Sequence, residues 1–232
     1  MNSWMLSLKQ GGESMLENEL DASNFLYNGE VYNKEFELIL CKITSCYFML
    51  KKDEKEVPLN NENGIRDIIV NNYINNPEIK KSLNLNYFVL PEVPESNSTG
   101  RTDIRIFSPN TFYNQDEYYI IECKRLDQKA RRGTSGLNYE YINNGINRFI
   151  TGKYSSHYKI NAMLGFVIDS LDIHNNIEDI NYLLKNNFTQ IATTSFLQKE
   201  NFIDNFEFHY SSTHLTNDKQ DLKLYHLMFS FV

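Results

Sequence analysis

Several features are scarce in this chain of 232 residues, and each scarcity excludes a class of protein. Its three cysteines, Cys41, Cys46 and Cys123, form no C-x-x-C pair, so the sequence predicts neither a disulfide framework nor a thiolate zinc site. No run of eighteen apolar residues occurs, which argues against a membrane-spanning helix. The N-terminus lacks a basic region followed by an apolar stretch, so we expect no secretory signal and a cytoplasmic protein with reduced thiols.

Two catalytic signatures are also missing. The chain has no G-x-S-x-G sequence, which serine hydrolases use, and no G-x-x-x-x-G-K sequence, which cradles phosphates in P-loop proteins. Hydrophobic residues make up 41% of the chain, as in a globular protein that can bury a substantial core.

The most informative stretch runs from Gly100 to Leu126. Thr102–Phe107 alternates between two kinds of residue, as a half-buried strand does, and Ser108–Asn110 interrupts it. Tyr118–Lys124 begins as an apolar run and ends in Glu-Cys-Lys, which predicts a second strand. If the two strands pair, an acid of the first lies beside the acid and the lysine of the second.

This pairing would gather Asp103, Glu122 and Lys124 on one face, with Cys123 on the other. Carboxylates held close together repel one another, and a hard divalent cation relieves that repulsion. Mg²⁺ takes oxygen ligands and usually keeps waters that a phosphate can replace. A lysine beside it can orient or deprotonate the attacking water. The pattern therefore predicts metal-dependent hydrolysis of a phosphodiester; the alternative is a surface salt-bridge cluster on a solvated sheet.

An acid two residues before a lysine is common by chance. The same spacing recurs at Asp53/Lys55, Glu78/Lys80, Asp127/Lys129 and Asp221/Lys223. Glu122/Lys124 differs in its context, because four apolar residues lead into it and an aspartate lies on the preceding strand.

Asp103, followed after eighteen residues by Glu122-Cys123-Lys124 in a hydrophobic strand, resembles the PD-(D/E)XK nuclease superfamily, which has the restriction endonuclease-like fold. The match runs from about Asn61 to Asp169, and Thr102 stands where the written motif has proline. The resemblance implies an α/β fold with a central mixed sheet flanked by helices. We accordingly expect an N-terminal helical extension over residues 1–60 and a nuclease domain over residues 61–232.

The resemblance also implies roles for individual residues. Asp103 and Glu122 would hold Mg²⁺, for which Mn²⁺ can substitute, and the Cys123 backbone carbonyl would add a ligand. Lys124 would position the water. Glu62 would supply a further acid from the start of a helix, or else it only complements the helix dipole.

Charge is unevenly distributed along the chain. The net charge is -7, yet Lys124–Lys159 holds eight basic and two acidic residues. A basic segment beside the predicted site is what a protein that binds a phosphate backbone would carry, although a solvated charge run looks the same. The predicted contacts with nucleic acid are Arg101, Arg105, Arg125, Arg131, Arg132, Arg148 and Lys153.

The resemblance favours DNA over RNA as the substrate, because most members of the family cut DNA. A homodimer would supply one active site for each strand of a duplex. Defence of a bacterium against foreign DNA is the role that the resemblance suggests. The alternative function is a catalytically inactive module on the same fold that binds nucleic acid or a protein partner.

Periodicity predicts the remaining elements. Helices are expected at Val31–Leu50, Ile65–Asn75, Asn138–Ile150 and Asn176–Asn186. Further strands are expected at Leu85–Val93, Asn161–Asp169, Phe188–Leu197, Phe202–Tyr210 and Leu222–Val232.

Overall fold

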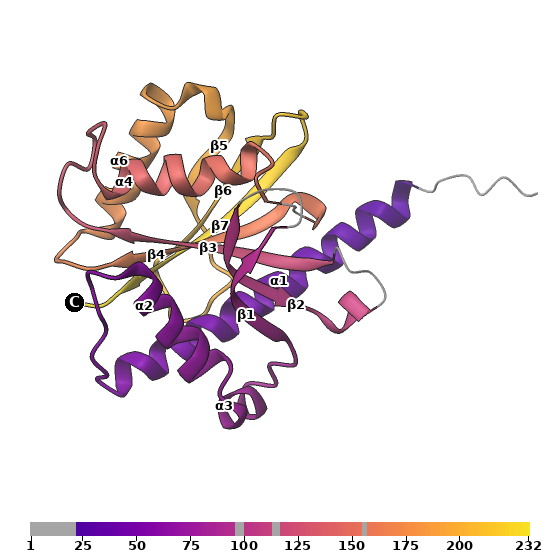
Figure 1. Cartoon of the computed structure of the whole chain (residues 1–232). Coiled ribbons are helices and arrows are strands. Elements are labelled where there is room, and N and C mark those ends of the chain that lie inside the picture. The colour runs from indigo at the N-terminus through magenta and orange to yellow at the C-terminus, as the bar shows by residue number, and fades with distance from the viewer. Residues whose placement is uncertain (1–21, 96–99, 113–116, 155–156) are drawn as a thin grey trace, which may run out of the picture.

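A computed structural model of the chain describes residues 22–95, 100–112, 117–154 and 157–232 (Figure 1). Over these residues the chain has an α/β fold, in which one mixed sheet of seven strands is flanked by helices. The predicted fold class is confirmed at this level.

The strands lie in the order β1-β2-β3-β4-β7-β6-β5. Their bounds are β1 (Phe88–Pro94), β2 (Arg101–Phe107), β3 (Tyr118–Leu126), β4 (Ile160–Val167), β5 (Thr193–Lys199), β6 (His209–Leu215) and β7 (Asp221–Ser230). The three central strands β3, β4 and β7 are parallel to one another, and the other neighbours pair antiparallel.

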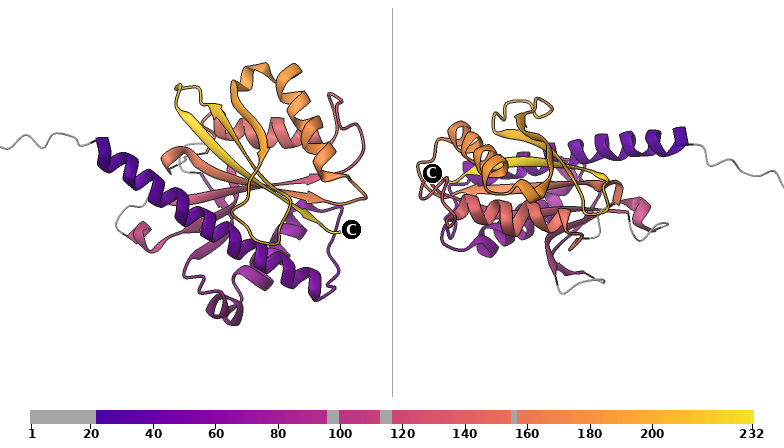
Figure 2. Two further views of the ribbon diagram at one scale, coloured as in Figure 1. Left: turned by 180° about the vertical axis from the view of Figure 1, so that it is seen from behind. Right: turned by 90° about the horizontal axis from the view of Figure 1, so that it is seen from above.

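Helices cover both faces of the sheet (Figure 2). One face carries α1 (Ala22–Lys52), α2 (Glu62–Asp67), the π-helix η1 (Ile68–Ile74) and α3 (Pro77–Ser82). The other face carries α4 (Leu137–Tyr141), the π-helix η3 (Ile142–Ile146), α5 (Asn147–Ile150) and α6 (Ile173–Asn186). The strand, strand, strand, helix, strand order that the resemblance implies is the order of β1, β2, β3, α4–α5 and β4.

The long helix α1 belongs to the core of the sheet. Phe36, Leu40 and Ile43 recur at three- and four-residue spacing and are fully buried against β3, β4 and β7 residues such as Tyr119 and Tyr225. The described part of the segment 1–60 is therefore mainly one helix, and that helix shares its core with the sheet.

A chain of buried hydrogen bonds crosses the other side of the sheet. The Tyr141 hydroxyl contacts His226 Nδ1, Ser212 Oγ bridges His226 Nε2 and His214 Nε2 at 2.8 Å each, and Thr193 Oγ1 contacts His214 Nδ1. Burial lowers the pKa of His214 to about 4 and that of His226 well below its ordinary value, so both imidazoles are neutral near pH 7. These two histidines are structural.

One predicted strand is wrong. The segment Phe202–Phe208 forms turns and extended loop, and β6 begins only at His209. Its apolar residues Ile203 and Phe206 are buried because they cover the end of the α1 core, so their hydrophobicity reflects packing and not a strand period. The helix α3 was not predicted, although Asn76 caps it and Pro77 occupies its first turn.

No helix in the described ranges is both long enough and apolar enough to cross a membrane. The three cysteines are free thiols, and Cys46 and Cys123 are buried.

Candidate active site

The candidate site lies where two strands of the sheet separate. Pairing between β2 and β3 ends at Ile104 and Ile121, whereas β3 continues beside β4 as far as Leu126. Beyond Ile121, the edge of β3 that faces β2 therefore has no strand partner.

Two carboxylates accept the backbone hydrogen bonds that a neighbouring strand would otherwise accept. Asp103 Oδ2 accepts a hydrogen bond from the Cys123 backbone N–H at 2.7 Å, and Glu62 Oε2 accepts one from the Arg125 backbone N–H at 2.9 Å. Asp103 comes from β2, while Glu62 comes from the first turn of α2, which Asn61 caps. Each amide thus keeps a hydrogen-bond acceptor where β2 no longer supplies one, and both acids are held at the edge of β3.

The Lys124 ammonium lies among oxygens at this edge. Its Nζ is 2.6 Å from the Cys123 carbonyl oxygen, 2.8 Å from Glu122 Oε1, 3.1 Å from Glu62 Oε1 and 3.8 Å from Asp103 Oδ2. The structure therefore brings together all five residues that were predicted as catalytic or metal-binding groups.

Glu122 is the most deeply buried acid of the site, with no exposed surface. Burial and the nearby charge of Asp103 raise its pKa to about 7, although Lys124 and Arg148 pull it down. Burial alone would lower the pKa of Lys124, but Glu122, Asp103 and Glu62 outweigh burial and hold that pKa above its ordinary value. The charge of Asp103 contributes to both shifts, because it disfavours an ionised Glu122 and favours a protonated Lys124.

Two further residues hold Glu122. Arg148 in α5 places Nη1 2.7 Å from Glu122 Oε1, and the Tyr154 hydroxyl donates to Glu122 Oε2 at 2.7 Å. Gly145 in η3 lies over β3 and β4, where a Cβ would overlap the Met163 methyl group of β4 and lie 3.6 Å from Lys124 Cγ of β3.

Arg66 was missed by the sequence reasoning. Its guanidinium is buried and contacts Asp103 Oδ1 at 3.4 Å, Glu92 Oε1 at 3.1 Å and Asp67 Oδ1 at 2.8 Å. A signal was present, because Arg66 lies four residues before the buried Val70 and so on the stripe that faces the core. Tyr154 follows a helix end and carried no such signal.

The oxygens around Lys124 fit a hard cation in their chemistry. Mg²⁺ is held by one or two carboxylates at about 2.0–2.1 Å together with water and phosphate. Here the carboxylates are spread around the larger ammonium, and across the described ranges no three His, Cys, Asp or Glu side chains converge closely enough to hold a metal ion. Asp103, Glu122 and the Cys123 carbonyl are oxygen donors of the kind that Mg²⁺ takes, and the cations now paired with the two acids must give way before an ion can bind.

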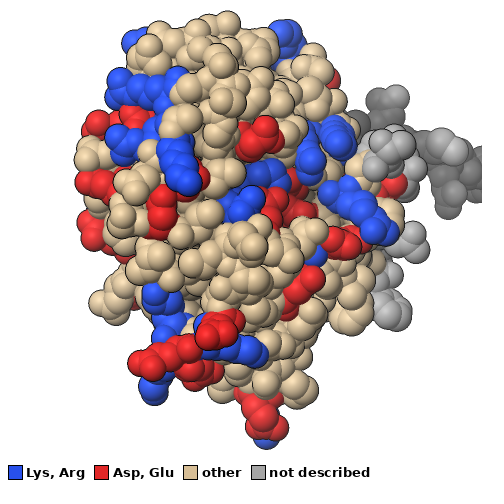
Figure 3. All heavy atoms as spheres, turned by 60° about the vertical axis from the view of Figure 1, so that its left-hand side comes forward, with Lys and Arg blue, Asp and Glu red and all other residues tan. Residues whose placement is uncertain are grey.

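Some of the predicted nucleic-acid contacts lie at this site. Arg148 forms an ion pair with Glu122. The side chain of Arg101 is 60% exposed and lies 3.7 Å from Glu92 Oε2. Lys153 directly precedes Tyr154, whose hydroxyl lies 3.0 Å from the Arg101 carbonyl oxygen. Acidic and basic side chains are intermixed across the face of the molecule shown in Figure 3.

Other predicted contacts are directed elsewhere. Arg131 and Arg132 both pair with Asp179 of α6, at 2.9 Å and 2.5 Å, and Arg132 also lies over the Tyr182 ring. Arg125 directs its guanidinium toward the Leu59 carbonyl oxygen.

Arg105 requires a correction. Its side chain is buried, pairs with Glu95 at 2.5 Å and lies 4.3 Å from the centre of the Tyr118 ring. A guanidinium enclosed in this way does not reach a phosphate, so the predicted contact at Arg105 is wrong. Arg105 lies on the face of β2 that the alternation predicts, but that face is buried at this position.

Burial separates Glu122/Lys124 from the other acid-x-lysine pairs. Asp53, Glu78 and Asp221 are exposed and Asp127 is half-buried, whereas Glu122 is fully buried. The alternative of a solvated surface cluster therefore does not describe Glu122.

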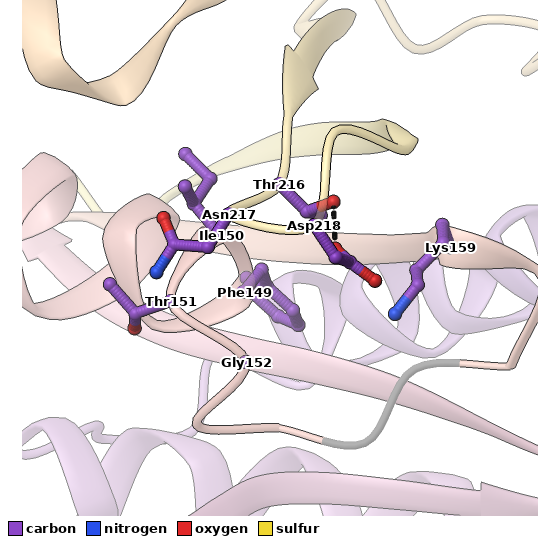
Figure 4. Close-up of a pocket in the computed structure, with 8 residues that line it drawn as sticks. All are labelled: Phe149, Ile150, Thr151, Gly152, Lys159, Thr216, Asn217 and Asp218. Carbon is purple, nitrogen blue, oxygen red and sulfur yellow. Dashed lines mark hydrogen bonds between the residues drawn. The ribbon is translucent and has the colours of Figure 1, made fainter.

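A separate pocket of about 230 Å³ lies between the end of α5 and the turn that joins β6 to β7 (Figure 4). Of its lining side chains only Lys159 and Asp218 are charged, and Asp218 accepts a hydrogen bond from Thr216. The pocket holds none of the acids around Lys124, so it is distinct from the candidate site.

Comparisons with family models, curated proteins and solved structures found no match for this chain. The chemistry of the site itself is therefore the basis for a functional proposal.

Proposed function

We propose that this protein is a Mg²⁺-dependent nuclease with a restriction endonuclease-like core, acting on phosphodiester bonds of DNA. One observation carries the proposal: Glu62, Asp103, Glu122 and the Cys123 carbonyl surround a single ammonium at an unpaired strand edge. Such a concentration of acids around a largely buried position costs stability, and acids held at such a cost are characteristic of functional sites.

Asp103, Glu122 and the Cys123 carbonyl are the proposed ligands of Mg²⁺ or Mn²⁺. When bound there, the ion would stabilise negative charge on the phosphate oxygens and make a water molecule more acidic.

Lys124 and Glu62 act on the water in this proposal. Because the pKa of Lys124 is raised, the lysine is protonated and donates hydrogen bonds, which favours orientation of the water over removal of its proton. Glu62 holds the Lys124 ammonium through Oε1 and the Arg125 amide through Oε2, so it fixes the lysine relative to β3.

The preference for DNA, the homodimer and the role in defence are proposed on the resemblance alone, whereas the cytoplasmic location is proposed because the cysteines are free thiols. A duplex cut on both strands requires two active sites, which a second copy of the chain would supply.

A second function has a specific observation in its favour. Asp103 and Glu122 already form ion pairs with three cationic side chains: Arg66, Lys124 and Arg148. A non-catalytic module would need no metal in this cluster, and it would use the exposed arginines only to bind nucleic acid or a protein.

Cleavage assays distinguish the two functions. Plasmid DNA and single-stranded DNA and RNA are incubated with Mg²⁺ or Mn²⁺ and with the wild type, Asp103→Asn, Glu122→Gln or Lys124→Met. We expect each substitution to lower the cleavage rate by at least about 100-fold, since each removes a group that acts on the reacting phosphate or water. Asp221→Asn is the matched control, because Asp221 is an exposed acid with the same spacing to a lysine. Equal residual activity in all five proteins would refute the nuclease.

A further inference from the structure

Arg148 and Lys124 share one oxygen of Glu122. Arg148 Nη1 is 2.7 Å and Lys124 Nζ is 2.8 Å from Oε1. A carboxylate oxygen has two lone pairs, and here both face a cationic donor. A divalent cation can bind Oε1 only after at least one of these donors has left.

Of the two donors, Arg148 can leave Oε1 with the smaller loss of contacts. Its side chain is 28% exposed, against 9% for Lys124, and apart from Glu122 it contacts Tyr154, whose hydroxyl accepts a hydrogen bond from Nη1 at 2.8 Å. Lys124 keeps Glu62 and the Cys123 carbonyl as partners wherever Arg148 goes. A guanidinium also matches the paired oxygens of a phosphodiester better than an ammonium does.

Tyr154 keeps Glu122 in place when Arg148 leaves. The ring is buried, and its hydroxyl contacts Glu122 Oε2 at 2.7 Å and the Arg101 carbonyl oxygen at 3.0 Å. Oε2 therefore stays fixed through Tyr154, and Oε1 remains directed toward the edge of β3. Tyr154 is a positioning residue in this arrangement.

We propose that Arg148 is a ligand for a phosphodiester group of the substrate and that, when no phosphodiester is bound, it covers Oε1 of Glu122. The phosphodiester draws Arg148 away and so exposes Oε1 to the metal. This proposal rests on the proposed nuclease function. It requires metal and nucleic acid to bind cooperatively, each raising the affinity for the other by the same factor.

Calorimetric titration of Mn²⁺ into the full-length protein tests this coupling without a cleavage readout. Each titration is made with and without a short DNA duplex whose phosphorothioate linkages resist hydrolysis. For the wild type we expect the duplex to raise the Mn²⁺ affinity about 10-fold, a typical coupling between two sites. For Arg148→Met we expect tighter Mn²⁺ binding without the duplex and no further gain when the duplex is added.

Two other variants complete the test. Arg148→Lys keeps the charge without the planar fork and should retain part of the coupling, which a purely structural role of Arg148 would not predict. Lys199→Met removes one exposed positive charge on the edge strand β5 and should behave as the wild type does.

The outcomes separate this proposal from the nuclease proposal. If Arg148→Met binds Mn²⁺ as the wild type does and keeps the same response to the duplex, Arg148 does not cover Glu122 and only the present inference is overturned. If none of the proteins binds Mn²⁺ in either condition, both proposals are overturned. A folded Arg148→Met, checked by circular dichroism, that binds Mn²⁺ more tightly without DNA supports both.

Discussion

Glu122→Gln should make the protein more stable at neutral and alkaline pH while it abolishes the proposed activity. Glutamine keeps the shape of the neutral carboxyl group and removes a charge that is fully buried. Burial and Asp103 raise the pKa of Glu122 from 4.5 to about 7, so the folded protein favours the protonated acid more than the unfolded chain does.

The sign and size of the effect follow from this difference. Between pH 4.5 and about pH 7 the folded state holds a proton that the unfolded state has released, so the free energy of unfolding falls as the pH rises. One pKa unit corresponds to about 1.4 kcal/mol, so the wild type should lose about 3 kcal/mol across this window. Glu122→Gln should not show that loss.

Chemical unfolding of both proteins at several pH values between 4 and 8, in the presence of EDTA, measures the effect. The difference in free energy of unfolding between the two proteins isolates the contribution of Glu122. The buried His214 and His226 have lowered pKa values and so change stability with pH in the opposite direction, but they do so equally in both proteins and cancel. The reasoning is refuted if the difference stays constant with pH, or if Glu122→Gln is the less stable protein at pH 8.

Three further substitutions test other contacts. Lys124→Met should destabilise the protein by about 3 kcal/mol in EDTA, because the surrounding carboxylates lose the cation that they share, and added Mg²⁺ should restore part of that stability in urea unfolding. Arg66→Met should cost about 1–3 kcal/mol, because Asp103 loses one of its two cations and keeps only Lys124 and the Cys123 amide; thermal unfolding would measure the loss. Ser212→Ala should cost about 1–3 kcal/mol, because two buried imidazoles lose a partner, yet it should leave DNA cleavage unchanged.

The sequence was sufficient for the parts of the site that depend on strand periodicity. Alternation along two short strands placed Asp103, Glu122 and Lys124 on one face, and the register of β2 and β3 agrees with this. The apolar stripes of α1 and of the segment Leu137–Ile150 were likewise visible as periodic patterns.

Other parts could not be predicted, because they depend on where elements separate or meet. The bond from the Arg125 amide to Glu62 exists only because β2 pairs with β3 from Ile104 onward and not before it, and nothing local in the sequence marks that point. Tyr154 reaches Glu122 from a loop. Hydrophobicity misled the prediction at Phe202–Tyr210, where the apolar residues cover a core without forming a strand along most of the segment.

The acids at the unpaired part of β3 have a consequence for solubility. Exposed peptide groups at a strand edge invite pairing with another chain, and natural sheets block such edges with charges. Asp103 and Glu62 occupy two amides that an incoming strand would otherwise use. Alanine at both positions would leave these two amides without a partner and open to pairing with another chain, so the groups assigned to chemistry also cap this edge of the sheet.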